Sequence, residues 1–343
     1  MGGHRKPKMT DLSATAGQHM QREIAEAPRV FAAAVAQPVT LPDLTNLRAI
    51  YTVARGSSDA AANILAYELM RETQLPVTSL PPSIFSLGQG VRLTDSAVLV
   101  VSQSGASPDL VRSAQGAKAT GATVLALTNA PQSPVEAEAH ATLRIGAGPE
   151  LAVPATKSVV GAIAGGMALL SALTPAYASR AKASARAIAA LQGKTLPQQK
   201  SLLAALLRAS HVYVIGRDTG FGAAQELALK LKECCALHAE AYSSSEVLHG
   251  PLQLVTNPLL ILILDTEQPE VQESLDTAEQ RFKAAGGTTF RLRPSDAGAT
   301  SLTPAAAAAA LLILTYPLAL QTALALGHDP DRPATLSKVT QTR

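Results

Sequence analysis

Short apolar runs alternate along the chain with longer segments in which apolar residues recur every three or four positions. In the first half, the apolar runs at 48–54, 96–102 and 122–129 predict buried strands, and the segments at 60–72 and 110–121 predict helices. A polar turn separates each of the first two strands from the helix that follows it. This alternation is typical of a parallel sheet covered by helices on both faces, so the pattern predicts an α/β fold.

The same plan returns in the second half of the chain. Apolar runs at 211–216, 259–265 and 288–293 predict strands, and a turn at 217–222 is predicted before a helix at 223–233. The sequence "KATGATVLAL" in the first half is echoed by "KAAGGTTFRL" in the second. We therefore infer a tandem duplication of one doubly wound parallel-sheet domain, a flavodoxin-like three-layer sandwich.

The polar segment 191–200 is the predicted junction between the two domains. The predicted division is an N-terminal extension and helix at 1–45, a first domain at 46–190, a second domain at 201–330 and a C-terminal tail at 331–343. A length of 343 residues suits two domains of ordinary size.

Composition and charge narrow the class of protein. With 47% hydrophobic and 16% charged residues the chain is globular, and a net charge of +3 is too small to indicate a nucleic-acid surface. The two cysteines, Cys234 and Cys235, are adjacent and hence a poor disulfide pair, which favours buried thiols in a reducing compartment. We expect a cytoplasmic protein with no nucleic-acid partner.

One segment has the length and apolarity of a membrane span. Residues 305–327 carry no charge, but they are largely alanine, Pro317 interrupts them, and no basic flank follows directly. We therefore expect a buried helix and no membrane partner. The basic start of the chain, residues 1–9, is not followed by an apolar segment and does not indicate a secretory signal.

The loop after the apolar run 96–102 is rich in hydroxyl and backbone donors. In doubly wound sheets, ligands bind where strands lead into helices, because unpaired N–H groups and the helix dipole converge there on an anion. Gly105 would let the backbone approach a phosphate closely, and Pro108 suits the first position of a helix. The predicted phosphate-binding side chains of this loop are Ser102, Gln103, Ser104 and Ser107.

A second serine loop follows the neighbouring predicted strand, where Ser57 and Ser58 could reach the same ligand. Serine is also a common helix cap, so a purely structural role is the alternative. Without a GxxxxGK[ST] or GxGxxG pattern, a small phosphorylated metabolite is favoured over a nucleotide. The corresponding loop of the second half carries Asp265, Glu267 and Glu270, which would repel phosphate, so we expect one phosphate site per chain.

The densest run of ionisable residues lies at 225–251. Glu226, Lys230 and Glu233 are spaced to share one helix face among apolar neighbours, so their charges should be partly desolvated and their pKa values shifted. The same run contains His238, Glu240, Glu246 and His249. Because neither an HExxH pattern nor a closely spaced His/Cys set is present, we expect no metal and no cofactor. A carboxylate beside a lysine and a histidine suits proton transfer next to a carbonyl or imine.

With these motifs in view, the chain resembles the SIS (sugar isomerase) family. The motifs that carry the resemblance extend over nearly the whole chain and are "MQREIAEAP", "RGSSDAA", "SQSGASPDL", "ELAVPATKS", "ELALKLKE", "HAEAYSSSEVLHGP" and "DPDRPATLSKVTQTR". The chain is similar to the double-SIS isomerase half of glutamine-dependent glucosamine-6-phosphate synthase without its glutaminase domain, and looks most like the stand-alone SIS-type glucosamine-6-phosphate deaminases. The resemblance implies a metal-independent enzyme that isomerises and deaminates glucosamine 6-phosphate to fructose 6-phosphate and ammonia.

The resemblance also implies roles for individual residues. Glu233 matches the base that moves a proton between C1 and C2, and Lys230 matches a neighbouring charged group. His249 matches a ring-opening residue that the neighbouring subunit supplies, which implies a homodimer. Lys338 matches the lysine that forms an imine with a ketose in the synthase, a step that requires a deprotonated amine. The residues that match the family's sugar-phosphate contacts are Ser57, Ser58, Ser102, Gln103, Ser104 and Ser107.

Ala155 departs from the family pattern, because the synthase has a sugar-contacting serine there. This difference leaves two other activities open, a deglycase for fructosamine 6-phosphates and a deaminase for galactosamine 6-phosphate. A non-catalytic sugar-phosphate sensor is the alternative from another class, since SIS domains also serve as ligand-binding modules in regulators. The combination of Glu233, His249 and Lys338 favours an enzyme.

Overall fold

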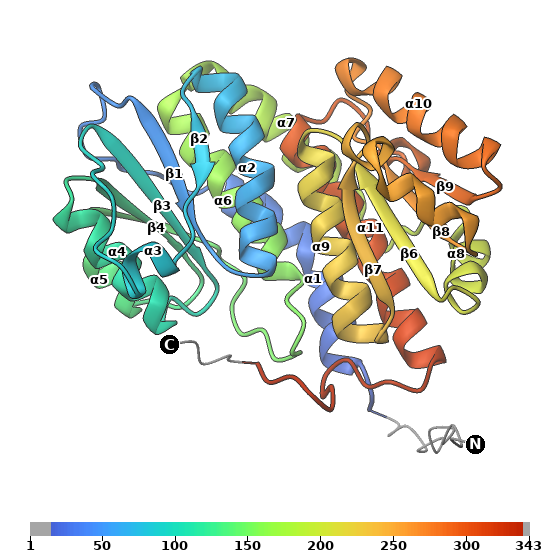
Figure 1. Cartoon of the computed structure of the whole chain (residues 1–343). Coiled ribbons are helices and arrows are strands. Elements are labelled where there is room, and N and C mark those ends of the chain that lie inside the picture. Colours follow the sequence, from blue (N-terminus) through green and yellow to red (C-terminus); the bar gives the residue numbers. More distant parts are fainter. Residues whose placement is uncertain (1–14, 339–343) are drawn as a thin grey trace.

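Two parallel β-sheets form the framework of the computed structural model, which describes residues 15–338 (Figure 1). The first sheet has five strands in the order β2-β1-β3-β4-β5. Its strands are β1 (Ala49–Val53), β2 (Val77–Ser79), β3 (Ser96–Ser102), β4 (Thr123–Thr128) and β5 (Ala141–Arg144). Every residue of β3 is buried, as expected for the central strand of a parallel sheet between layers of helices.

The second sheet repeats this plan with the order β7-β6-β8-β9. Its strands are β6 (His211–Gly216), β7 (His238–Ser243), β8 (Leu260–Leu264) and β9 (Thr288–Leu292). All strand pairs in both sheets are parallel, and the second sheet has the same order as the first four strands of the first sheet. The predicted fold class, two doubly wound α/β units, is therefore confirmed. We call the part built on β1–β5 the first unit and the part built on β6–β9 the second unit.

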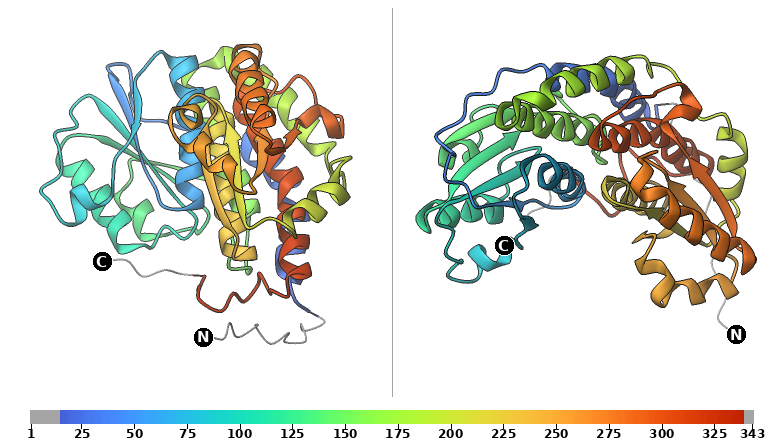
Figure 2. Two further views of the ribbon diagram at one scale, coloured as in Figure 1. Left: turned by 45° about the vertical axis from the view of Figure 1, so that its right-hand side comes forward. Right: turned by 90° about the horizontal axis from the view of Figure 1, so that it is seen from above.

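The helices of the two units share one core. Helix α2 of the first unit packs against α9 of the second, and α11 packs against α9 and α1. Seen from above, the two sheets lie on opposite sides of α2 and α9 (Figure 2). The α-helices are α1 (Gln18–Val35), α2 (Ser57–Thr73), α3 (Ser83–Ser86), α4 (Pro108–Ala119), α5 (Pro134–Glu138), α6 (Lys157–Leu173), α7 (Ala178–Ala189), α8 (Gln199–Leu206), α9 (Thr219–Cys235), α10 (Pro269–Ala284) and α11 (Pro304–Ala325). Four short 3-10 helices complete the described chain: η1 (Pro175–Tyr177), η2 (Glu246–His249), η3 (Pro251–Thr256) and η4 (Pro294–Ala297).

Helix α11 is the apolar segment with the length of a membrane span. By length and composition it is the one helix in residues 15–338 that could cross a bilayer, and 83% of its most apolar stretch is buried inside the fold. The prediction of a buried helix is confirmed, because α11 fills the space between the two units rather than presenting an apolar surface.

Two local features of α9 bear on the predictions. Its start at Thr219 lies inside the segment 217–222, so the prediction of a turn throughout that segment is wrong. Asp218 explains the earlier start, because its carboxylate accepts a hydrogen bond from the Thr219 N–H at 2.7 Å and so caps the helix. At the other end, Cys234 and Cys235 are buried free thiols, which confirms that they do not form a disulfide.

Candidate functional site

A cavity of about 360 Å³ lies between the two units, at the carboxyl ends of β1 and β3. It brings together both serine loops, the segment before α6, the end of α9 and the C-terminal tail. The predicted site residues that line it are Ser57, Ser58, Ser102, Gln103, Ser104, Ser107, Ala155, Glu233 and Lys338. The other residues that line it are Arg55, Gly56, Val101, Leu110, Val153, Leu336 and Ser337.

Two hydrogen bonds within the loop after β3 fix the conformation of its backbone. The Ser102 hydroxyl accepts from the Gly105 N–H at 3.0 Å, and the Ser104 hydroxyl accepts from the Ala106 N–H at 3.3 Å. Gly105 has a φ of +59°, and a Cβ there would lie 2.2 Å from the hydroxyl of Ser133. Only glycine fits this position, so the backbone can curl back towards the start of α4. The loop thus directs its backbone and hydroxyl groups to the cavity.

The serine side chains are not helix caps. Ser107 is the N-cap residue of α4, yet its side chain makes no capping hydrogen bond. The N-cap of α2 is Gly56, so Ser57 and Ser58 already lie within the helix. Helix capping therefore does not account for Ser57, Ser58 and Ser107, whereas the Ser102 and Ser104 hydroxyls order the loop after β3.

Arg55 is a lining residue that the sequence interpretation did not single out. Its Nε donates to Oδ2 of Asp109 at 2.6 Å, and Asp109 is fully buried at the start of α4. The pair joins the loop after β1 to the helix after β3. The arginine that precedes "GSSD" was the available signal, because a guanidinium beside hydroxyl donors suits a phosphate.

The charged face of α9 lies directly behind the cavity. The Lys230 ammonium is fully buried and forms an ion pair with Glu233, whose side chain reaches the cavity and is 24% exposed. Glu226, also fully buried, has its Oε1 at 3.5 Å from the same ammonium. Burial acts to lower the pKa of Lys230, but the two carboxylates outweigh it and raise the pKa above its ordinary value. The three residues share one helix face, as predicted, and Glu226 and Lys230 on that face are fully buried.

Lys338 is the last described residue, and the final five residues of the predicted tail lie outside the described range. Its Nζ donates to the Ala152 carbonyl at 2.6 Å and lies 3.4 Å from Oε2 of Glu150. Further back, the Asp331 carboxylate accepts from the N–H groups of His19 and Met20, at 2.8 and 2.9 Å, at the start of α1. The tail is thus fastened at two points and passes over the cavity between them.

The remaining members of the ionisable run lie elsewhere. His249 is exposed at the end of η2 and is not among the residues that line the cavity of its own chain. His238 is exposed at the start of β7, where its Nδ1 lies 3.1 Å from Nδ1 of His211. Glu240 accepts a hydrogen bond from the Tyr242 hydroxyl at 3.0 Å, and Glu246 is exposed. Within residues 15–338, no group of three or more His, Cys, Asp or Glu side chains is arranged to hold a metal ion.

The matching loop of the second unit carries a negative charge of its own. Asp265 follows β8 and is fully buried, and its Oδ1 accepts from the Glu267 N–H at 2.8 Å. Its Oδ2 accepts from Arg291 at 2.8 Å and from Arg293 at 3.0 Å. Burial alone would raise the pKa of Asp265, but a hydrogen bond from the Gln272 amide at 2.9 Å and these other donors together hold it below the ordinary value. In this loop the two arginines thus pair with a carboxylate of the protein itself.

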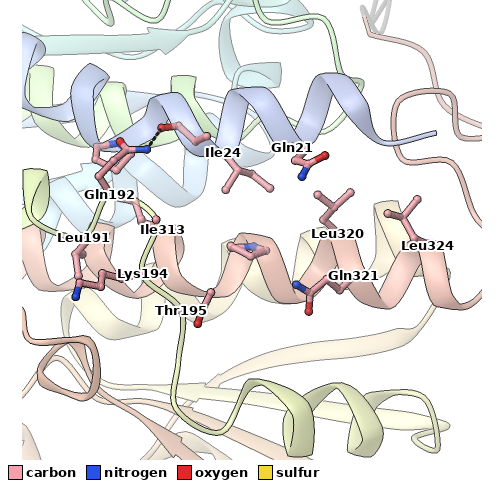
Figure 3. Close-up of a pocket in the computed structure, with 14 residues that line it drawn as sticks. Gln21, Ile24, Leu191, Gln192, Lys194, Thr195, Ile313, Leu320, Gln321 and Leu324 are labelled. Atoms are coloured by element: carbon pink, nitrogen blue, oxygen red, sulfur yellow. Dashed lines mark hydrogen bonds between the residues drawn. The ribbon is translucent and has the colours of Figure 1, made fainter. Parts of the chain in front are cut away.

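A second cavity, of about 280 Å³, lies between α1, α11 and the segment 191–195 (Figure 3). Apolar side chains such as Ile24 and Leu320 point into it, and at one end Gln192 donates to the Ala25 carbonyl at 3.0 Å. Its lining residues, all of them within the described part of the chain, include neither a carboxylate nor a histidine. Lys194 is the ionisable side chain among these lining residues.

Comparison with known proteins identifies relatives of both halves of the chain. A family model for the SIS domain matches residues 43–172 and 205–292. The curated glutamine–fructose-6-phosphate aminotransferase (isomerizing) of Symbiobacterium thermophilum is 31% identical over 318 residues, which cover 85% of this chain and 51% of the relative. The chain therefore spans about half the length of this relative.

Two solved structures are similar over almost their whole length. A protein of Silicibacter pomeroyi DSS-3, provisionally described as a phosphosugar isomerase, is 31% identical with a TM-score of 0.78, and the match covers 91% of this chain and 99% of that one. The glucosamine-6-phosphate deaminase of Thermotoga maritima has a TM-score of 0.74 at 18% identity, covering 94% of this chain and 100% of that one. At that identity, the second likeness shows a common fold.

Proposed function

This chain belongs to the SIS domain family, and we propose that it is an amino-sugar-phosphate isomerase and deaminase that converts glucosamine 6-phosphate and water to fructose 6-phosphate and ammonia. The observation that carries the proposal is the cavity that both serine loops, Glu233 and Lys338 line together. Phosphate donors and a carboxylate base at one cavity are what aldose–ketose isomerisation of a sugar phosphate requires. The curated relative is named for fructose 6-phosphate, the ketose of the proposed reaction.

In this proposal the serine loops hold the phosphate. The N–H groups at the start of α2 and α4 supply the positive ends of two helix dipoles, and the serine hydroxyls add direct donors. Arg55 adds a cation that Asp109 partly offsets. A cavity of about 360 Å³ is in the usual range for a small-molecule site.

The Glu233 carboxylate is the proposed base. It takes the proton from C2 of the open-chain aldose and returns it to C1, while O1 gains a proton and the nitrogen loses one, so that the C1 aldehyde becomes an alcohol and the C2 amine an imine. Water adds to this imine, and the resulting carbinolamine releases ammonia and leaves fructose 6-phosphate. The buried Lys230 ammonium forms an ion pair with this carboxylate and so holds it in place at the cavity.

We propose that His249 acts in the cavity of a neighbouring chain. It is exposed and does not line the cavity of its own chain, so a homodimer in which the partner's His249 opens the sugar ring would complete the site. Lys338 is proposed to contact the open-chain sugar. For an imine to form, its ammonium has to lose a proton, and the Glu150 carboxylate lies 3.4 Å away.

The first experiment incubates the purified protein with glucosamine 6-phosphate, without added metal, and follows ammonia and fructose 6-phosphate together. Equal amounts of both products support the proposal. Galactosamine 6-phosphate and a fructosamine 6-phosphate are assayed in parallel, because Ala155 leaves these substrates open. If these sugar phosphates raise the melting temperature without any turnover, the protein is a sensor and the proposal is wrong.

The shared site is tested by mixing two inactive chains. Glu233→Gln and His249→Asn each remove one proposed catalytic group, so each homodimer should be inactive. Coexpressed chains form mixed dimers in which one of the two sites has both groups, and activity should return to about a quarter of the wild-type level for random assortment. If the mixture remains as inactive as the single variants, His249 does not act across an interface.

A further inference from the structure

Glu226 is a fully buried carboxylate that contacts both units of the protein. It lies on α9 of the second unit, one helical turn before Lys230, whose ammonium is 3.5 Å from its Oε1. The Tyr316 hydroxyl, from α11, donates to the same oxygen at 3.1 Å. The Ser57 hydroxyl, from α2 of the first unit, interacts with the same carboxyl group. Glu226 therefore connects one serine of the proposed phosphate site to the proposed base.

The surroundings of Glu226 allow it to exchange a proton near neutral pH. Burial raises its pKa, Lys230 lowers it and Glu233 raises it, with a result of about 7. The hydroxyls of Ser57 and Tyr316 both lower the pKa, because they donate to the ionised form. The oxygen Oε2 is buried without a well-formed hydrogen bond, which also makes the ionised form costly. The titratable groups that act on Glu226 are thus Lys230 and Glu233 on its own helix and Tyr316 on α11.

We propose that Glu226 is a positioning residue that couples occupancy of the phosphate site, through Ser57, to the charge state of the Lys230–Glu233 pair. This inference rests on the proposed function, because it takes Glu233 as the base and Ser57 as a phosphate ligand. Ser57 lines the cavity and interacts with Glu226, and Lys230 interacts with both carboxylates. The path therefore leads from the phosphate site through Glu226 and Lys230 to the base.

The coupling arises because a bound phosphate and the Glu226 carboxylate compete for the Ser57 hydroxyl. When a phosphate draws the Ser57 hydroxyl to itself, Glu226 loses a donor that stabilises its ionised form, and it takes up a proton from solvent. The neutral carboxyl then attracts the Lys230 ammonium less strongly. Lys230 is left to pair with the Glu233 carboxylate, the proposed acceptor of the substrate proton. Binding of the phosphate would thus prepare the base in the other unit.

The test measures proton uptake on binding of glucitol 6-phosphate, an open-chain hexitol phosphate that has no carbonyl and cannot react. Isothermal titration calorimetry at pH 7 in two buffers of different ionisation enthalpy gives the number of protons exchanged. We expect net uptake to be smaller in Glu226→Gln than in the wild type, because glutamine cannot take up a proton. Changes in phosphate ionisation are common to both proteins and cancel in the comparison.

Glu68→Gln is the matched control. Glu68 is also a fully buried carboxylate, it accepts a hydrogen bond from the Tyr177 hydroxyl at 2.6 Å, and it does not line the cavity. It should bind the ligand with the proton uptake of the wild type. If Glu226→Gln and Glu68→Gln both keep the wild-type uptake, the coupling is refuted.

Steady-state kinetics distinguish a positioning role of Glu226 from a purely structural one. We expect Glu226→Gln, whose amide is neutral at every pH as the protonated carboxyl is, to keep kcat and KM within about threefold of the wild type and to lose a step near pH 7 in its pH profile. Tyr316→Phe keeps the Glu226 carboxyl and removes only one hydrogen-bond donor to it, so the step in the pH profile should move to higher pH. This variant keeps the proposal testable if Glu226→Gln folds poorly. A profile identical to the wild type in both variants would overturn the inference.

The outcomes also separate this inference from the proposed function. Proton uptake that depends on Glu226, in a protein that turns over no amino-sugar phosphate, refutes the proposed function and supports the coupling. Turnover of glucosamine 6-phosphate with an uptake that does not depend on Glu226 supports the function and refutes the coupling. If glucitol 6-phosphate and glucosamine 6-phosphate both fail to bind, both proposals are wrong.

Discussion

Lys338 Nζ lies 3.4 Å from the Glu150 carboxylate, so the last described residue of the chain is held by the segment that leads into α6. Glu150 is nearly fully buried, and it also accepts hydrogen bonds from the N–H groups of Thr156 and Ser158, both at 3.0 Å. The same carboxylate therefore orders the segment with Ala155 and fastens the tail over the cavity.

Removal of the Lys338 ammonium should impair turnover more than stability. In Lys338→Met we expect activity on glucosamine 6-phosphate to fall about tenfold or more, because the tail loses its contact at the cavity. The free energy of unfolding should change by about 1 kcal/mol or less, since Lys338 is partly exposed and Glu150 keeps its amide donors. The control is Lys283→Met on α10, which removes an exposed ion pair with Glu279. Wild-type turnover in Lys338→Met would show that the tail lysine is not needed.

Replacement of the proposed base should leave binding and remove turnover. Glu233→Gln retains the shape of the side chain and a partner for Lys230, so glucosamine 6-phosphate should still raise the melting temperature. We expect kcat to fall about 100-fold or more, because the amide cannot accept the C2 proton. Glu273→Gln, an exposed change on α10, is the control. A fully active Glu233→Gln would remove Glu233 from the mechanism.

The serine loop should not tolerate a Cβ at Gly105. Gly105→Ala combines a positive φ with a contact 2.2 Å from Ser133, so we expect a loss of about 1–3 kcal/mol in unfolding free energy and much weaker phosphate binding. Gly146→Ala separates the two effects, because Gly146 has a φ of +70° and nothing within 4 Å of its added Cβ. Urea unfolding of both variants gives the comparison. Equal losses would mean that the contact with Ser133 relaxes without cost.

Glu226 should make stability depend on pH. Its pKa is raised from an ordinary 4.5 to about 7 in the folded protein, so its contribution is fully present below about pH 4.5 and is lost as pH rises through about 7. Between pH 4.5 and 8 the wild type should lose roughly 3 kcal/mol relative to Glu226→Gln, which does not titrate. Urea unfolding of both proteins across this range measures the difference in slope. Parallel curves would exclude a raised pKa at Glu226.

The sequence predicted the parts of the fold in which burial is complete. Strands β3, β6 and β8 are almost wholly apolar, and their predicted ranges match the observed strands closely. Strand β7 was not predicted, because the polar and charged residues of 238–243 indicated a cluster of ionisable groups instead. Strands β2 and β5 are short edge strands with little apolar signal, which is why their residues carried no recognisable pattern.

For the site, sequence reasoning could find residue types but not tertiary partners. The serine loops have a local signal, since small donors follow buried strands at both places. The spacing in the sequence singles out Glu226 beside Lys230, but its neighbours Ser57 and Tyr316 come from distant parts of the chain. The same holds for Glu150, whose contact with Lys338 spans most of the sequence. Only the folded chain brings these groups together.

Because of Asp265, the order of the loops in the two units should depend differently on bound small molecules. Two arginines of its own unit already neutralise this carboxylate, so the second unit carries a built-in counterpart of a bound anion whatever the metabolite concentration. The proposed phosphate loop of the first unit has no such internal substitute, and its order would rise with ligand supply. Under the proposed function, a bound sugar phosphate would therefore protect the serine loops of the first unit from local unfolding, while the loop at Asp265 needs no ligand for its order.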